Sequence, residues 1–170
     1  MKDGQPQAVL LADYSPPTYL IDTTELRFEL AAGSTTVTSR LAIRRNPAVR
    51  ETGPLVLNGQ SLELMSVALD GEALSANAFT VDADGLVIHD APDDFTLLVV
   101  TRIHPEENTA LEGLYHSGSM YCTQCEAEGF RRITYYLDRP DVMSKFRTTI
   151  VGDGAELPIM LSNGDRKSVV

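Results

Sequence analysis

The sequence predicts an all-β fold, arranged as a sandwich or an open, curved sheet with little helix. Apolar and polar residues alternate through many short segments, which is typical of strands with one buried face. Asn-Gly and Asp-Gly pairs recur between these segments and favour the tight turns that join antiparallel strands. Many short strands separated by frequent turns indicate a β-sandwich or a curved sheet.

The individual strands follow from this alternation. Residues 26–30 place apolar side chains at every second position, and Val37, Leu41 and Ile43 share one face of the segment 37–43. Residues 62–69 keep the rhythm with one slip at Met65, which indicates a β-bulge. Residues 95–103 form a denser apolar run rich in β-branched side chains. The remaining predicted strands are 55–57, 79–81, 86–89, 132–136, 147–151 and 158–161.

Three dipeptides predict tight turns, because Asn or Asp followed by Gly accepts a positive φ angle. These dipeptides are Asn58-Gly59, Asp70-Gly71 and Asp84-Gly85. Helix signals are few. The segment 138–145 could form one short helical turn, because Pro140 lies near its start. No internal repeat or domain boundary interrupts the chain, so we expect residues 1–170 to form a single β domain.

Composition excludes several classes of partner. The chain has 14 basic and 24 acidic residues and a net charge of −10. Binding to nucleic acid or to an anionic membrane needs a basic surface, so neither is expected as a partner. No segment approaches the roughly 20 apolar residues of a membrane span. The start of the chain lacks the pattern of a signal peptide, since Asp13 interrupts the short apolar stretch 8–12.

The two cysteines, Cys122 and Cys125, are three positions apart. A zinc ribbon would need a second such pair, and the histidines His89, His104 and His116 lack the spacing of paired ligands. A redox pair would need a strand-to-helix junction, which the pattern does not indicate. Zinc and redox roles stay open as minor alternatives, and reduced thiols in a cytoplasmic protein are the expectation.

Residues 108–142 are dense in polar groups without clear alternation, which favours a loop or a surface strand. Within this segment Gln124 and Glu126 would point to the same side of a strand. An amide oxygen and a carboxylate on one face suit a small cation such as an ammonium group. The alternative is two solvated side chains on an exposed edge. No HExxH, GxSxG or phosphate-binding loop occurs, so the residues offer no complete catalytic site.

The same segment carries a family resemblance. The runs TALEGLYHSG and CTQCEAEGFRRITYYLDRPDVMSKF resemble the N-terminal domain of the bacterial aminopeptidase N family of HExxH/GAMEN zinc peptidases. The opening DYSPPTY, from Asp13 to Tyr19, is similar to the family's DY-x-x-P-x-Y pattern. Shorter similarities at 57–59 and 161–164 extend the match to most of the chain.

This resemblance implies a saddle-shaped domain of curved antiparallel sheets that caps a zinc-containing catalytic domain. It places substrate binding on Gln124 and Glu126, which would hold the free α-amine of a peptide. It assigns the zinc ligands, the GAMEN motif and the transition-state tyrosine to that next domain. We therefore expect no catalytic residue, metal ligand or cofactor in this chain, and no activity from it alone. The expected partners are the peptide N-terminus and the catalytic domain of the same parent chain.

Neighbouring residues have expected structural roles. Glu128 and Arg132 are expected to support the loop through ion pairs, and Cys125 to face the core. Tyr135 and Tyr136, adjacent on a predicted strand, should face opposite sides. The turn after Leu161 suggests a partner strand beyond the end of the chain. Two other functions stay open: a stand-alone β-sandwich module that binds peptides or proteins, and a structural or inhibitory domain of the same family.

Overall fold

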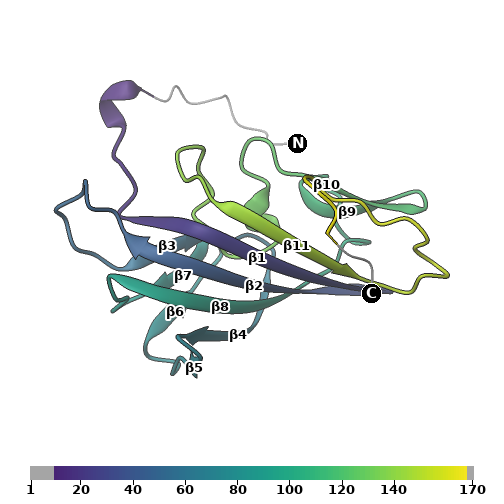
Figure 1. Ribbon diagram of the computed structural model, residues 1–170, viewed down its shortest axis with the longest axis horizontal. Helices are drawn as coiled ribbons and strands as arrows, with labels where there is room; N and C mark the ends of the chain where they lie inside the picture. The colour runs from purple at the N-terminus through teal and green to yellow at the C-terminus, as the bar shows by residue number, and fades with distance from the viewer. Residues whose placement is uncertain (1–9, 168–170) are drawn as a thin grey trace.

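The computed structural model describes residues 10–167 and confirms the all-β prediction (Figure 1). The strands form three sheets of six, three and two strands. Within the described residues, helix is limited to two short 3₁₀ turns, η1 (Leu11–Asp13) and η2 (Phe130–Arg132). Alternating side chains therefore identified the dominant structure correctly.

The six-stranded sheet is the base of the domain. It has the order β11-β1-β2-β8-β4-β5, and every neighbouring pair is antiparallel except β1 and β11, which run parallel. Its strands are β1 (Tyr19–Ala31), β2 (Ser34–Arg45), β4 (Glu63–Leu69), β5 (Glu72–Ala73), β8 (Asp94–Ile103) and β11 (Lys145–Val151). The long β1–β2 hairpin has a register shift between Ile21 and Thr23.

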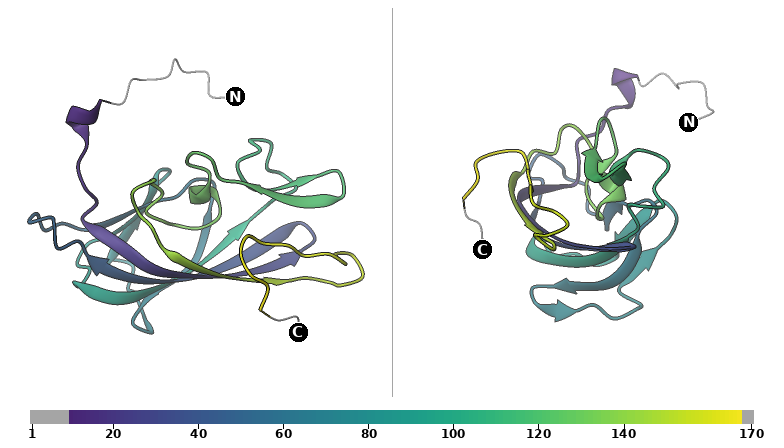
Figure 2. Two further views of the ribbon diagram at one scale, coloured as in Figure 1. Left: turned by 45° about the horizontal axis from the view of Figure 1, so that its top comes forward. Right: turned by 90° about the vertical axis from the view of Figure 1, so that its right-hand side faces the viewer.

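Two smaller sheets lie over this large sheet (Figure 2). The three-stranded sheet has the order β3 (Leu55–Asn58), β7 (Gly85–Ile88) and β6 (Phe79–Val81). The two-stranded sheet is a hairpin of β9 (Gly113–Ser117) and β10 (Met120–Gln124). The hairpin and the loop after it lie over one face of the curved large sheet, as the left view of Figure 2 shows.

The core has two parts that match this arrangement. In the first, side chains of the large sheet such as Leu41 and Leu97 pack against Leu57 and Leu86 of the three-stranded sheet. In the second, Phe28, Val37 and Ile103 of the large sheet pack against Leu114 of β9 and Ile133 after η2. The hairpin is thus anchored to the large sheet by apolar packing, while its hydrogen-bonded pairing stays within its own two strands.

The turn predictions had mixed outcomes. Asp70-Gly71 joins β4 to β5 with positive φ angles of 50° and 90°, as a tight hairpin turn requires. Asp84-Gly85 completes the β6–β7 turn, in which the backbone N–H groups of both residues donate to the Asp82 carboxylate. The bulge at Met65 is confirmed by a register shift between Leu64 and Ser66.

Asn58-Gly59 does not form a hairpin. β3 pairs with β7, and the chain then crosses from the three-stranded sheet to β4 in the large sheet. Asn58 instead forms an isolated bridge with Tyr136. The dipeptide signal is local, whereas the strand partner is set by which sheet buries the next apolar face.

Three other predicted elements were wrong. Residues 132–136 are not a strand, because Thr134, Tyr135 and Tyr136 are buried by packing and side-chain hydrogen bonds instead of a ladder. Residues 158–161 are not a strand either, since no neighbouring strand in the described part of the chain pairs with them. The segment 138–145 forms a turn closed by the Arg139–Asp141 ion pair, and no helical turn.

Gly85 is expected to be essential for the three-stranded sheet. A Cβ atom at this position would collide with the Leu57 carbonyl oxygen and lie 3.1 Å from its carbon. Because these are backbone atoms of the paired strand, Gly85→Ala should lower the free energy of unfolding by about 2–3 kcal/mol. Urea unfolding of the chain measures this. Gly154→Ala is the matched control, since its Cβ meets no atom within 4 Å. Equal stability of the two variants would contradict the packing described here.

Candidate functional site

The β9–β10 hairpin carries the residues that the sequence singled out. Gln124 is the last residue of β10 and pairs with Gly113 at the start of β9. The backbone N–H of His116 donates to the Pro105 carbonyl at 3.0 Å, and the Tyr121 hydroxyl donates to Glu106 at 2.6 Å. These contacts and the burial of Leu114 fix the hairpin on the body of the domain.

A tight loop, residues 125–129, follows Gln124 and leads into η2. The Gly129 N–H donates to the Cys125 carbonyl at 3.0 Å, which closes the loop. A Cβ atom on Gly129 would lie 2.6 Å from the Gln124 carbonyl oxygen and 2.9 Å from the Cys125 Cα. The peptide bond between Glu126 and Ala127 is cis. The loop therefore returns directly onto the end of β10, and only glycine fits at its closing position.

Gln124 and Glu126 lie at the junction of β10 and this loop, and they are not two residues of one strand. β10 ends at Gln124, and Glu126 lies in the turn that follows. The Glu126 N–H donates to the Gln124 side-chain oxygen at 3.4 Å. Both side chains are exposed. The prediction of a shared strand face was wrong, because β10 ends two residues before Glu126.

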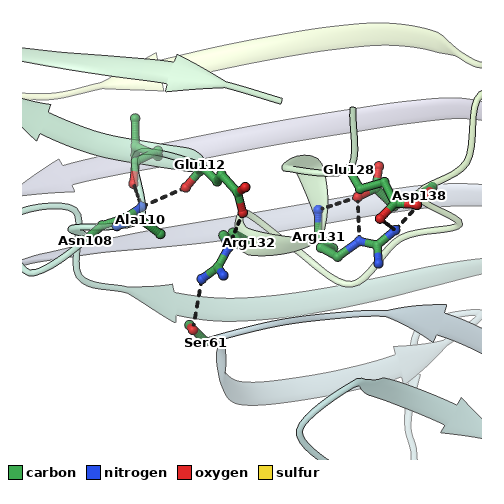
Figure 3. Close-up of polar contacts among 9 residues, drawn as sticks. Ser61, Asn108, Ala110, Glu112, Glu128, Arg131, Arg132 and Asp138 are labelled. Atoms are coloured by element: carbon green, nitrogen blue, oxygen red, sulfur yellow. Dashed lines mark hydrogen bonds and ion pairs between the residues drawn. The ribbon is translucent and has the colours of Figure 1, made fainter. Parts of the chain in front are cut away.

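Two arginines that follow this loop, Arg131 and Arg132, bond to neighbouring polar and acidic side chains (Figure 3). Arg132 donates from Nε to Glu112 at 3.1 Å and from Nη1 to Ser61 at 3.2 Å. Arg131 lies within 3.5 Å of Glu128. The expectation that Glu128 and Arg132 form ion pairs is correct for each residue, although they do not pair with each other. Among the described residues, Glu126 forms no ion pair.

Arg131 also anchors η2 to the body of the domain. Its backbone N–H and its Nε both donate to the Asp138 carboxylate, at 3.0 and 2.9 Å, and its Nη2 donates to the Asp138 carbonyl at 3.0 Å. The Arg131 carbonyl accepts from the Gln60 N–H at 2.9 Å. The two charged side chains are largely buried, at 14% and 10% exposure. A buried and multiply bonded pair of this kind holds one geometry.

A small cavity borders the loop. It measures about 100 Å³ and is lined by Gln60, Glu112, Ala127, Glu128 and Arg131. Pockets that enclose a small ligand usually measure about 300–1,000 Å³. The described part of the chain therefore presents the Gln124–Glu126 loop on an open surface beside this cavity.

Cys125 and two of the histidines make contacts that stabilise the fold. Cys125 packs against the second core, and its burial, with a smaller contribution from the Asp138 charge, raises the pKa of its thiol. Both cysteines are free. His89 bonds to Thr80, and His104 bonds to the Gly33 carbonyl. In residues 10–167 no cluster of three metal-binding side chains occurs, and no helix is long and apolar enough to cross a membrane.

The adjacent tyrosines contact different parts of the domain. Both are buried, at 2% exposure for Tyr135 and 5% for Tyr136. Gly59 lies against the Tyr135 ring, and the Tyr136 hydroxyl lies 3.1 Å from the Thr24 hydroxyl. Both rings are therefore packed in the interior, although this segment is not a strand.

The Tyr121–Glu106 bond should be visible in a pH titration. This bond, followed by burial and the Glu106 charge, raises the pKa of Tyr121 to about 12. Burial alone would raise the pKa of Glu106, but hydrogen bonds from Tyr121 and from backbone N–H groups outweigh it and lower that pKa. The carboxylate form thus favours the native hairpin at neutral pH, and this contribution is lost as the pH falls through the lowered pKa of Glu106.

Replacing Glu106 with Gln is expected to lower the pKa of Tyr121 from about 12 toward its ordinary value of 10.0. The variant removes the charge that disfavours the phenolate while it leaves an acceptor for the hydroxyl. NMR titration of the ¹³C-labelled tyrosine ring measures the change. Glu107→Gln, at the neighbouring exposed position, is the control. A Tyr121 pKa that is the same in both variants would contradict the bond.

Comparison with known proteins places this chain in a family. The Peptidase M1 N-terminal domain model matches residues 15–170. The chain is 50% identical over 165 residues to aminopeptidase N of Caulobacter vibrioides, a match that covers 97% of this chain and 19% of that protein. It is 48% identical over 162 residues to aminopeptidase N of Escherichia coli, covering 95% and 18%.

Solved structures agree with this placement. The crystal structure of Legionella pneumophila aminopeptidase A in complex with aspartic acid superposes with a TM-score of 0.85 at 31% identity, covering 91% of this chain and 18% of that one. The chain thus spans about a fifth of the length of the curated relatives that it matches. Because the family model covers almost all of the sequence, the chain belongs to the Peptidase M1 N-terminal domain family.

Proposed function

We propose that this chain is the N-terminal domain of a zinc-dependent aminopeptidase that removes N-terminal residues from peptides, and that its Gln124–Glu126 loop binds the substrate α-amine. One observation carries the proposal. Glu126 is exposed, its backbone N–H donates to the Gln124 side-chain oxygen at 3.4 Å, and its carboxylate has no ion pair among the described residues, whereas Glu128 and Glu112 are each paired with an arginine. Membership of a family whose curated relatives are aminopeptidases supports it.

The chemistry of the ligand fits this pair. A peptide α-amine has a pKa near ~8 and is largely protonated at neutral pH. The Glu126 carboxylate supplies the opposite charge, and the Gln124 side-chain oxygen supplies a second acceptor. The α-ammonium group belongs to the first residue of the peptide. When the loop holds this group, the first peptide bond therefore lies at a fixed distance from the loop. Binding at the amine therefore selects cleavage after one residue.

The remaining chemistry belongs to the proposed catalytic domain of the same parent chain. Zinc held there would polarise the scissile carbonyl and activate a water molecule. The residues of this chain would bind and orient the amine, and they would close one side of the cleft. A peptide is the proposed substrate, and the cytoplasm is the proposed location, in line with the reduced cysteines.

An activity assay tests the proposal. The full-length protein is expected to hydrolyse amino-acid p-nitroanilides, to lose that activity with a zinc chelator, and to reject N-acetylated analogues. Acetylation removes the positive charge that Glu126 would bind, so kcat/KM for the acetylated analogues should be far below that for the free amines. Residues 1–170 expressed alone should show no turnover. Equal rates on free and acetylated substrates would contradict amine recognition.

A further inference from the structure

We propose that Arg132 is a positioning residue for amine binding, and that it acts by locking the 125–129 loop through Glu112 and Ser61. This inference rests on the proposed function, because it assigns the fixed position of Glu126 to a side chain that does not touch the substrate. Arg132 ends η2, three residues after Gly129, where the loop closes.

The Arg132 guanidinium joins three segments that are distant in sequence (Figure 3). It donates to Glu112, which immediately precedes β9, and to Ser61, in the crossover between β3 and β4. Ser61 itself has a positive φ of 55°, so the crossover presents its hydroxyl from a sharply turned backbone. The bonds of one side chain therefore hold η2, the base of the hairpin and the crossover together.

Close backbone packing makes this contact decisive for the loop. Gly113 pairs with Gln124, and a Cβ atom on Gly113 would lie 2.7 Å from the Arg132 Cβ and 3.3 Å from the Gly129 carbonyl oxygen. Both ends of the 125–129 loop therefore meet at Gly113. The Arg132–Glu112 bond fastens this meeting point, and a shift there would move Glu126 relative to Gln124.

The Arg132–Glu112 ion pair also affects the charge available at Glu126. Three glutamates, Glu112, Glu126 and Glu128, lie on or next to the loop and its hairpin. Arg131 pairs with Glu128 and Asp138, and Arg132 pairs with Glu112. Each arginine is thus engaged by another carboxylate, which leaves the Glu126 charge available for a cation. Removing the Glu112 charge would release Arg132 to compete with the substrate amine for Glu126.

The test uses two inhibitors that differ only in the α-amine: an amino-acid hydroxamate and its des-amino analogue. The ratio of their Kd values measures amine recognition in the full-length enzyme. Arg132→Gln and Glu112→Gln are each expected to reduce this ratio about tenfold, less than the roughly hundredfold that a 1 Å misplacement can cost. Arg132→Lys should restore part of the ratio, because an ammonium can still reach Glu112.

Arg44→Gln is the matched control, because Arg44 forms an ion pair with Asp22 at 3.0 Å on the large sheet. It should leave the ratio unchanged. Equal weakening of both inhibitors in Arg132→Gln and Glu112→Gln would show a merely structural role and overturn the inference. An unchanged ratio in folded variants would overturn it as well.

Glu126→Gln separates failure of this inference from failure of the proposed function. If Glu126→Gln leaves the ratio at the wild-type value, the proposed function itself fails. If only the Arg132 and Glu112 variants leave the ratio at the wild-type value, amine binding stands and the positioning role fails.

Discussion

Glu126→Ala in the full-length enzyme is expected to lower kcat/KM for free-amine substrates by about 30- to 4,000-fold. Removing one partner of a hydrogen-bonded charge pair costs about 2–5 kcal/mol, and each 1.4 kcal/mol corresponds to a factor of ten. The loss should be large because Glu126 supplies the only charge of the proposed Gln124–Glu126 pair. Steady-state kinetics on amino-acid p-nitroanilides measures it.

The control for this variant is Glu72→Ala, an exposed glutamate on β5 at the opposite edge of the large sheet from β11. It changes the net charge equally and should leave the kinetics at the wild-type value. Gln124→Ala should have a smaller effect than Glu126→Ala, because it removes a neutral acceptor. Wild-type kcat/KM in Glu126→Ala would refute the assignment of amine binding to this loop.

Gly129→Ala is expected to lower kcat/KM about a hundredfold, although Gly129 itself is not proposed to contact the substrate. The added Cβ would lie 2.6 Å from the Gln124 carbonyl oxygen and 2.9 Å from the Cys125 Cα, and both are backbone atoms that cannot rotate away. The loop must therefore move away from β10 and carry Glu126 with it. The stability of the enzyme should fall by about 1–3 kcal/mol at the same time.

Kinetics and urea unfolding of the same preparations separate the two effects of Gly129→Ala. Gly154→Ala, which meets no neighbouring atom, provides the baseline for a glycine-to-alanine change in a loop. A Gly129→Ala enzyme with wild-type kcat/KM would mean that the loop tolerates displacement, and the close return of residues 125–129 onto β10 would then have no role in function.

Strands were predictable from the sequence where one face of a sheet is buried. β8 shows this most clearly, since its burial alternates along nearly its whole length. The failures have a common cause. Residues 132–136 are β-prone, but they pack among side chains over the large sheet, and among the described residues their only bridge joins Tyr136 to Asn58 of β3 in the three-stranded sheet. Partner choice depends on tertiary contacts that local alternation does not encode.

The candidate site was also only partly predictable from the sequence. Gln124 and Glu126 were predicted from residue type and family resemblance, and the structure places Glu126 in a loop instead of on the strand that the alternation rule assumed. The partners of Arg132 could not be predicted, because Glu112 and Ser61 lie 20 and 71 positions away. The visible signal was a pair of adjacent arginines beside several glutamates, which indicates ion pairs but not which residues form them.

The most direct test of the central claim is calorimetric binding of the amino-acid hydroxamate and its des-amino analogue to wild-type enzyme and to Glu126→Gln. Glutamine keeps the shape of the side chain but removes its charge and one acceptor oxygen, which are the two features proposed to bind the amine. We predict that the wild type prefers the amine-bearing inhibitor and that Glu126→Gln loses most of this preference while its affinity for the des-amino analogue is unchanged. An undiminished preference in Glu126→Gln would contradict the proposal that this domain binds the substrate amine through Glu126.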